Sequence, residues 1–327
     1  RARRGRPARL ERGWRAFRGR AGTRRDAMND TAPAPGSRFA GDWLARRERV
    51  DHRSRAHGLA ALAAADLRRR GGARHTVVDL GAGGGSNLRY LIGHLAARLP
   101  EPVDWHLLDH DAGLLATALG ENRPEARAGD RVAGAVCDLA EPLAPHLAGA
   151  GLVTASALLD LVSLDWIEGF VAACAATRAA VLVAMSVDGR IEFDDPDPAD
   201  DLVRHAVAAD QRRDKGFGPA LGGAAPAALV NALAHAGYGV DTRPSDWRLD
   251  ARDMLLVDPL IDGWRAAAQR QRPKRRAAIA AWAARRTAAI AAGRTRLTVG
   301  HVDVLGLPNP RHLAWARRGA DPLLGPT

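Results

Sequence analysis

Cysteine is nearly absent from this chain, which has only Cys137 and Cys174 among its 327 residues. Both stand in apolar stretches, so we expect buried thiols in a reducing cytoplasm rather than a disulfide or a metal pair. Long hydrophobic runs are also missing. No stretch of about 18 apolar residues predicts a membrane span, and the N-terminus has no apolar core typical of a secretory signal. Because 46% of the residues are hydrophobic, a full core is nevertheless available.

Acidic residues are scarce mainly in the first 27 residues. That segment has eleven arginines against Glu11 and Asp26, so it carries +9 of the formal charge of +11 and the rest of the chain is nearly neutral. It shows no hydrophobic periodicity, and we therefore expect a disordered Arg-rich extension and linker over 1–36. Binding to RNA or to an acidic membrane surface is the alternative. Whether 1–27 belong to the native protein stays open.

From residue 76 onward, β-rich runs alternate with helical patterns, which predicts a mostly parallel α/β sheet with crossover helices. We expect a helical N-terminal cap over 37–75 and one main domain over 76–327. Within that domain, 188–224 are expected to form an inserted lid and 253–292 a helical insertion. The seven expected strands are Val77–Leu80, Val103–Asp109, Arg131–Asp138, Leu152–Leu159, Ala180–Val187, Gly239–Leu249 and Leu297–Leu305.

Three alternate glycines follow the first expected strand, at Gly81, Gly83 and Gly85, and Asp79 precedes them. Glycine lets the backbone bend sharply and approach a ligand that a Cβ atom would keep away. The helix that follows directs its N-terminus at the same place, which favours an anionic ligand group. The segment therefore predicts a nucleotide-type binding turn.

Two kinds of cofactor use such a turn. The dinucleotide fingerprint G-x-G-x-x-G needs glycine at 86 when it starts at Gly81, and Ser86 stands there. An acidic residue just before the glycines would repel a pyrophosphate, whereas it suits a ligand with an ammonium group. Asp79 thus favours S-adenosylmethionine over NAD.

These residues resemble the signature of the class I S-adenosylmethionine-dependent methyltransferases, D/E-x-G-x-G-x-G, which Asp79, Gly81, Gly83 and Gly85 match in full. The resemblance implies a Rossmann-like, doubly wound sheet of seven strands. It also implies that Asp109, at the end of the second strand, holds the ribose hydroxyls and that Asp138, at the end of the third, lies near the adenine amine. The chain departs from the family between its last two strands, where about 45 helical residues replace a short hairpin.

The methyl acceptor is expected outside the carboxyl ends of the strands. Asp160 follows the fourth strand, which in the resembling family faces the transferred methyl, and it is the candidate for orienting the acceptor or taking its proton. A helix cap or loop carboxylate is the equal alternative. Arg47 and Arg55 are expected mainly on a solvated helix face, with contact to the cofactor carboxylate as the alternative. The candidate acceptor-binding residues are Ser156, Asp188, Lys215, Phe217 and Asp246.

The acceptor class follows mostly from motifs that are lacking. There is no Asn/Asp-Pro-Pro-aromatic tetrapeptide, which amino-group methylators of bases carry, and no Pro-Cys pair, which cytosine-C5 enzymes need. The main domain is nearly neutral, so a phosphate-tracking groove is not evident. A small-molecule acceptor is therefore favoured. An RNA-associated methyltransferase that uses the basic tail and an NAD-dependent oxidoreductase are the alternatives.

Overall fold

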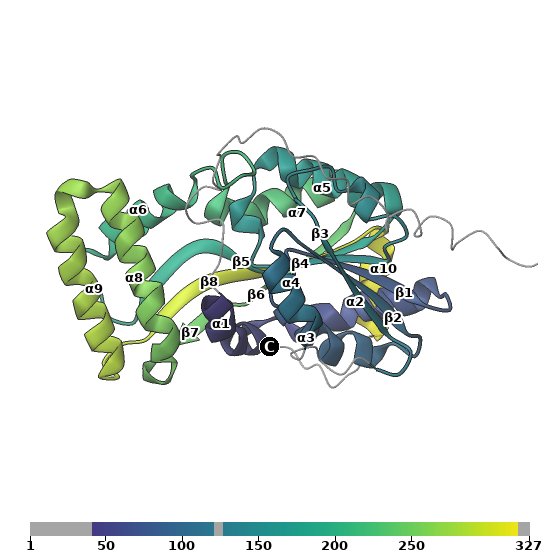
Figure 1. Ribbon diagram of the computed structural model, residues 1–327, viewed down its shortest axis with the longest axis horizontal. Coiled ribbons are helices and arrows are strands. Elements are labelled where there is room, and N and C mark those ends of the chain that lie inside the picture. The colour runs from purple at the N-terminus through teal and green to yellow at the C-terminus, as the bar shows by residue number, and fades with distance from the viewer. Residues whose placement is uncertain (1–40, 121–126, 320–327) are drawn as a thin grey trace, which may run out of the picture. The chain divides into compact units, whose positions relative to one another are not determined.

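The computed structural model describes residues 41–120 and 127–319, and the predicted extension over 1–36 lies outside them. In these ranges eight strands form one sheet (Figure 1). The order is β3-β2-β1-β4-β5-β8-β6, with β7 also paired to β8. The strands are β1 (His75–Leu80), β2 (Val103–Asp109), β3 (Arg131–Val136), β4 (Leu152–Ser156), β5 (Ala180–Phe193), β6 (Gly239–Pro244), β7 (Trp247–Leu249) and β8 (Leu297–Leu307).

The first five strands are parallel, and their order 3-2-1-4-5 is that of a doubly wound sheet. β8 then runs antiparallel to β5, β6 and β7. The predicted Rossmann-like fold class is therefore confirmed. Ten α-helices accompany the sheet in the described ranges: α1 (Gly41–Ser54), α2 (His57–Arg70), α3 (Ser86–His94), α4 (Ala112–Leu119), α5 (Leu164–Thr177), α6 (Asp200–Gln211), α7 (Ala225–His235), α8 (Met254–Gln271), α9 (Arg276–Ala291) and α10 (Pro310–Gly319).

Helices cover both faces of the parallel strands. Val77 of β1 points into the core shared with α2 and α3, whereas the next residue, Val78, points into the core shared with α5 and α7. This alternation follows from the two-residue period of a strand. One face of α3 is apolar and buried, through Leu88 and Leu91, and Leu95, which directly follows the helix, is buried as well. Because α2 belongs to this core, the N-terminal helices are part of the main packing.

A third core lies beyond the parallel strands, where β5 and β8 extend toward α6, α8 and α9 (Figure 1). Its largest buried side chains include Trp247, Trp264 and Trp282. The predicted helical insertion corresponds to α8 and α9, which separate β7 from β8 in the sequence. None of the helices in the described part of the chain is long and apolar enough to cross a membrane.

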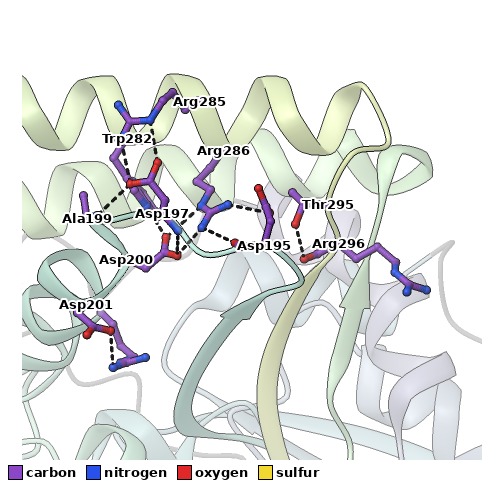
Figure 2. Close-up of polar contacts among 11 residues, drawn as sticks. Asp195, Asp197, Ala199, Asp200, Asp201, Trp282, Arg285, Arg286, Thr295 and Arg296 are labelled. Carbon is purple, nitrogen blue, oxygen red and sulfur yellow. Dashed lines mark hydrogen bonds and ion pairs between the residues drawn. The ribbon is translucent and has the colours of Figure 1, made fainter.

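The acidic half of the expected lid is bound to α9 (Figure 2). Arg286 is buried and donates to Asp195 and Asp200, while its guanidinium lies 4.0 Å from the ring centroid of Phe193. Arg285 donates to Asp197 at 2.7 and 2.9 Å. These carboxylates therefore join α6 and the segment just before it to α9. A lid over the whole of 188–224 stays a prediction.

The expected strand Gly239–Leu249 is wrong as one continuous strand, because it is interrupted at Ser245 and Asp246. Both pieces pair with β8. At the break, the backbone N–H of Ser245 donates to the carbonyl of His301, and the Asp246 carboxylate accepts from the N–H of His301 at 3.1 Å. A side chain here replaces a backbone acceptor, so the sheet has eight strands instead of seven.

Candidate functional site

A large cavity of about 790 Å³ lies at the carboxyl ends of the parallel strands. It spans the point between β1 and β4 where the strand order reverses, which is where doubly wound sheets bind their ligands. Its volume is within the range of small-molecule and cofactor sites. Of the candidate site residues singled out from the sequence, those that line it are Arg47, Gly81, Gly83, Asp109, Asp138, Ser156, Lys215 and Phe217.

The glycine turn that forms one wall needs its glycines. Gly81, Gly83 and Gly85 all have positive φ angles, of 64°, 50° and 82°, which side chains other than glycine rarely adopt. Gly85 also precedes α3 directly, and a Cβ atom on it would lie 3.0 Å from the Cβ of Ala118 in α4. The turn therefore lets β1, α3 and α4 converge on the cavity.

Asp109 fixes this turn from the end of β2. Its Oδ2 accepts from the backbone N–H of Gly83 at 2.7 Å, and its Oδ1 accepts from the N–H of Asp111 at 2.8 Å. The side chain is almost fully buried but still lines the cavity. Each carboxylate oxygen has two lone pairs, so capacity to accept from ligand hydroxyls remains.

Asp79 lies behind the cavity wall rather than in it. Its Oδ1 accepts from Asn87 at 2.6 Å, and Arg55 donates to the amide oxygen of Asn87 at 2.5 Å. The other oxygen, Oδ2, is buried without a hydrogen-bond partner among the described residues. Burial raises the pKa of Asp79 to about 7, although Asn87 and Arg55 oppose this. The site thus holds a carboxyl group with an unused acceptor beneath its surface.

The far end of the cavity, after β3, is apolar with one carboxylate. Val136 is 62% exposed although it is hydrophobic, and it lines the cavity together with Leu114 and Leu139. Asp138 is exposed, lines the same region and accepts from the backbone N–H of Ala140 at 2.9 Å. This combination suits a flat heterocycle with an exocyclic amine.

Helix α1 supplies a wall that the sequence did not predict. Arg47, Glu48 and Asp51 line the cavity, and the Glu48 carboxylate accepts from Arg89 of α3 at 2.7 Å. The expectation of a solvated face for Arg47 and Arg55 is wrong, since Arg55 is only 4% exposed and the Arg47 side chain 12%. Arg55 is held by Asn87 and by the ring of Tyr90, 3.8 Å from its guanidinium carbon. Arg55 directly follows α1, whereas these partners come from α3, so the sequence around Arg55 does not reveal them.

Three predicted residues lie away from the large cavity. Asp188 and Asp246 both bind the guanidinium of Arg190, each with a shortest distance of 2.7 Å. Asp160 lines a smaller adjoining cavity instead, where burial raises its pKa and the charges of Lys215 and Arg47 lower it. The structure thus separates these carboxylates from the glycine turn. In the described ranges, no cluster of His, Cys, Asp and Glu is arranged to hold a metal ion.

Comparisons with known proteins give distant likenesses. No family profile matches the chain, and no curated protein matches it. An O-methyltransferase family protein from Burkholderia thailandensis is 19% identical over 52% of this chain and 47% of its own length, with a TM-score of 0.36. The chain thus spans about half of that protein. The cyclopropane synthase MmaA2 from Mycobacterium tuberculosis is 12% identical over 75% of this chain and 82% of its own length, with a TM-score of 0.38. A SAM-dependent methyltransferase from Methanosarcina mazei is 11% identical over 73% of this chain and 95% of its own length, with a TM-score of 0.38. Since these TM-scores are below 0.5, no function is taken from them.

Proposed function

We propose that this protein is an S-adenosylmethionine-dependent methyltransferase that acts on a small molecule. The observation that carries the proposal is the glycine turn together with its carboxylates. Three alternate glycines with positive φ stand between buried Asp79 and Asp109, at the carboxyl ends of β1 and β2. A pyrophosphate would be repelled by both acids, whereas a cofactor with an ammonium group and two ribose hydroxyls complements them.

The residues present fit that cofactor along the length of the large cavity. The ribose would be held by Asp109, and the adenine would lie against Val136 with its amine toward Asp138. The amino-acid end would lie at the glycine turn, near Asn87 and above the unpartnered oxygen of Asp79. The carboxylate group would meet the N-terminus of α3, where backbone N–H groups are free to donate.

When bound, the cofactor supplies a methyl group attached to a cationic sulfonium, whose sulfur is a good leaving group. The chain's own residues then mainly position the acceptor and the methyl donor, and they exclude water. Ser156 and Ala157 at the end of β4 line the cavity wall next to the smaller cavity. Lys215 and Phe217 also line the large cavity, and the Phe217 ring packs edge-on against Trp166, with the ring centroids 6.1 Å apart. Asp160 is the residue we assign to the acceptor's proton.

Two further features belong to this proposal. Cys137 and Cys174 are both free and buried, which suits a reducing compartment such as the cytoplasm. A small-molecule acceptor is preferred over a nucleic acid because the arginines that line the two cavities each form an ion pair with a carboxylate and so make no track of unpaired cations; they are Arg47, Arg89, Arg190 and Arg204.

Calorimetry with S-adenosylhomocysteine and with NAD tests the proposal. We expect micromolar binding of the sulfur nucleoside and none of NAD. Asp109→Asn should weaken that binding about 10- to 100-fold, because a charge-assisted hydrogen bond contributes about 1.5–3 kcal/mol. Glu168→Gln is the matched control, since Glu168 is exposed on α5 and does not line the cavity. Binding of NAD without binding of the sulfur nucleoside would reverse the assignment.

A further inference from the structure

A second cavity of about 170 Å³ adjoins the large one. Arg47 and Ala157 line both cavities, so the two meet at the end of β4. An apolar protein cavity of about 150 Å³ is known to hold benzene. The smaller cavity therefore has the volume for a molecule with one six-membered ring and a small substituent.

Three tryptophans form its walls. Trp43 comes from α1, Trp247 from β7 and Trp264 from α8. They are three of only eight tryptophans in a chain with 5% aromatic residues, and segments more than 200 residues apart bring them together. Indole rings bind flat, unsaturated ligands by offset or edge-to-face contact. The aliphatic side chains of Leu260 and Val299 complete the apolar lining.

The cations in the lining already have carboxylate partners. Arg47 binds Asp51 at 2.8 Å, Arg204 binds Asp201 at 2.7 Å, and Arg190 binds both Asp188 and Asp246. His301 also lines the cavity, where burial lowers its pKa to about 4, so its ring is neutral. An anionic acceptor would find no uncompensated positive charge on these side chains, which favours a neutral one.

Backbone strain is concentrated where the cavities meet. Ala157 and Met185 have φ angles of 55° and 54°, which are rare for residues with a Cβ. The N–H of Ala157 donates to the carbonyl of Ala184 at 3.0 Å, and the N–H of Met185 donates to Asp303 at 2.8 Å. Both residues line the smaller cavity, next to a bulge in β5 between Val183 and Ser186. Strain and bulges of this kind occur at functional sites.

We propose that the smaller cavity binds a neutral, single-ring phenol as the methyl acceptor, with its ring among Trp43, Trp247 and Trp264 and its hydroxyl at Asp160. This inference rests on the proposed function. Asp160 lines this cavity, and although the charges of Lys215 and Arg47 act on its carboxylate, no ion pair within the described residues includes it, so the carboxylate is available to a ligand hydroxyl. In the reaction the phenol proton moves to the Asp160 carboxylate and an oxygen–carbon bond forms as the carbon–sulfur bond breaks. The electron pair stays on sulfur, and the products are an aryl methyl ether and S-adenosylhomocysteine.

The first test uses ligands of matched size on the protein loaded with S-adenosylhomocysteine. We expect 4-methylphenol to bind at least 10-fold more tightly than cyclohexanol, which has no aromatic ring, and than benzoate, which is anionic. Methyl transfer from S-adenosylmethionine to 4-methylphenol should be detectable by mass spectrometry. Equal or tighter binding of benzoate or cyclohexanol, or no binding of any of the three, would overturn the phenol proposal. Failure of the sulfur nucleoside to bind would instead overturn the proposed function.

Two variants test the placement. Ala208 of α6 lines only the smaller cavity, so Ala208→Phe should fill it and lower the affinity for 4-methylphenol at least 10-fold while leaving binding of the sulfur nucleoside unchanged. The control is Ala209→Phe, at a similarly half-buried neighbour outside the lining. Asp160→Asn should keep phenol binding within about 3-fold and lower kcat about 100-fold or more. A kcat within 3-fold of the wild type, or a filled cavity that still binds the phenol, would contradict the proposal.

Discussion

Gly85→Ala is the most direct test of the turn on which the site is built. Gly85 has a φ of 82°, and an added Cβ atom would lie 3.0 Å from the Cβ of Ala118 and 3.3 Å from its Cα. The left-handed conformation costs alanine about 1–2 kcal/mol. Crowding against α4 adds about 1–3 kcal/mol, as overpacking does elsewhere. We therefore expect the free energy of unfolding to fall by about 2–5 kcal/mol.

Gly84→Ala is the matched control. A Cβ atom on Gly84 would meet no heavy atom within 4 Å, and its φ is not in the left-handed region. We expect a change within about 0.5 kcal/mol. Both variants are compared by urea unfolding without ligand, because Gly84 lines the large cavity and a ligand would add its own stabilisation. Equal stabilities of the two variants, with unchanged m-values, would refute the geometry described for this turn.

Three further predictions follow from the buried charges. Burial raises the pKa of Asp79 to about 7, and a bound ammonium favours its carboxylate form. Binding of S-adenosylhomocysteine at pH 7 should therefore release up to about half a proton. Calorimetry in buffers of different ionisation enthalpy measures this release, and Asp79→Asn should abolish it. In the ligand-free protein the raised pKa of Asp79 stabilises the fold below about pH 4, and this contribution is lost as the pH rises through about 7. Thermal unfolding at several pH values should show that Asp79→Asn removes this dependence of stability on pH. An unchanged dependence in the variant would place its origin at another group. Arg286→Leu leaves Asp195 and Asp200 without their buried partner and should destabilise the protein by about 2–4 kcal/mol. The control Arg285→Leu, at an exposed arginine, should cost about 1 kcal/mol or less. Similar losses of stability in the two variants would show that Arg286 contributes no more than a surface ion pair.

Most of the parallel sheet could be predicted because its signals are local. Val77 and Val78 are buried on opposite faces of β1, and Leu88 and Leu91 are buried on one face of α3, as the periods of a strand and of a helix require. The break between β6 and β7 could not be predicted in this way. It depends on a hydrogen bond that the backbone N–H of His301 donates to the Asp246 carboxylate, and these residues are 55 positions apart in the sequence.

The candidate site divides along the same line. Gly81, Gly83 and Gly85 could be recognised from the sequence because positive φ is a demand that a few adjacent residues reveal. The burial of Arg55 could not be recognised, because its partner Asn87 lies on α3, 32 residues away in the sequence. Nor could the pairing of Asp188 and Asp246 on Arg190, which turns two candidate acceptor-binding residues into supports for a cavity wall.

The sequence by itself determined the glycine turn, the acids at the carboxyl ends of β1, β2 and β3, and the alternation that makes a parallel sheet, since each depends on the chemistry of neighbouring residues. Only the tertiary structure decided which charges are neutralised and which side chains share a cavity. Trp43, Trp247 and Trp264 meet because α1 packs against both β7 and α8 in one core. Such contacts are set by the packing of distant segments, whose energies no short stretch of sequence contains.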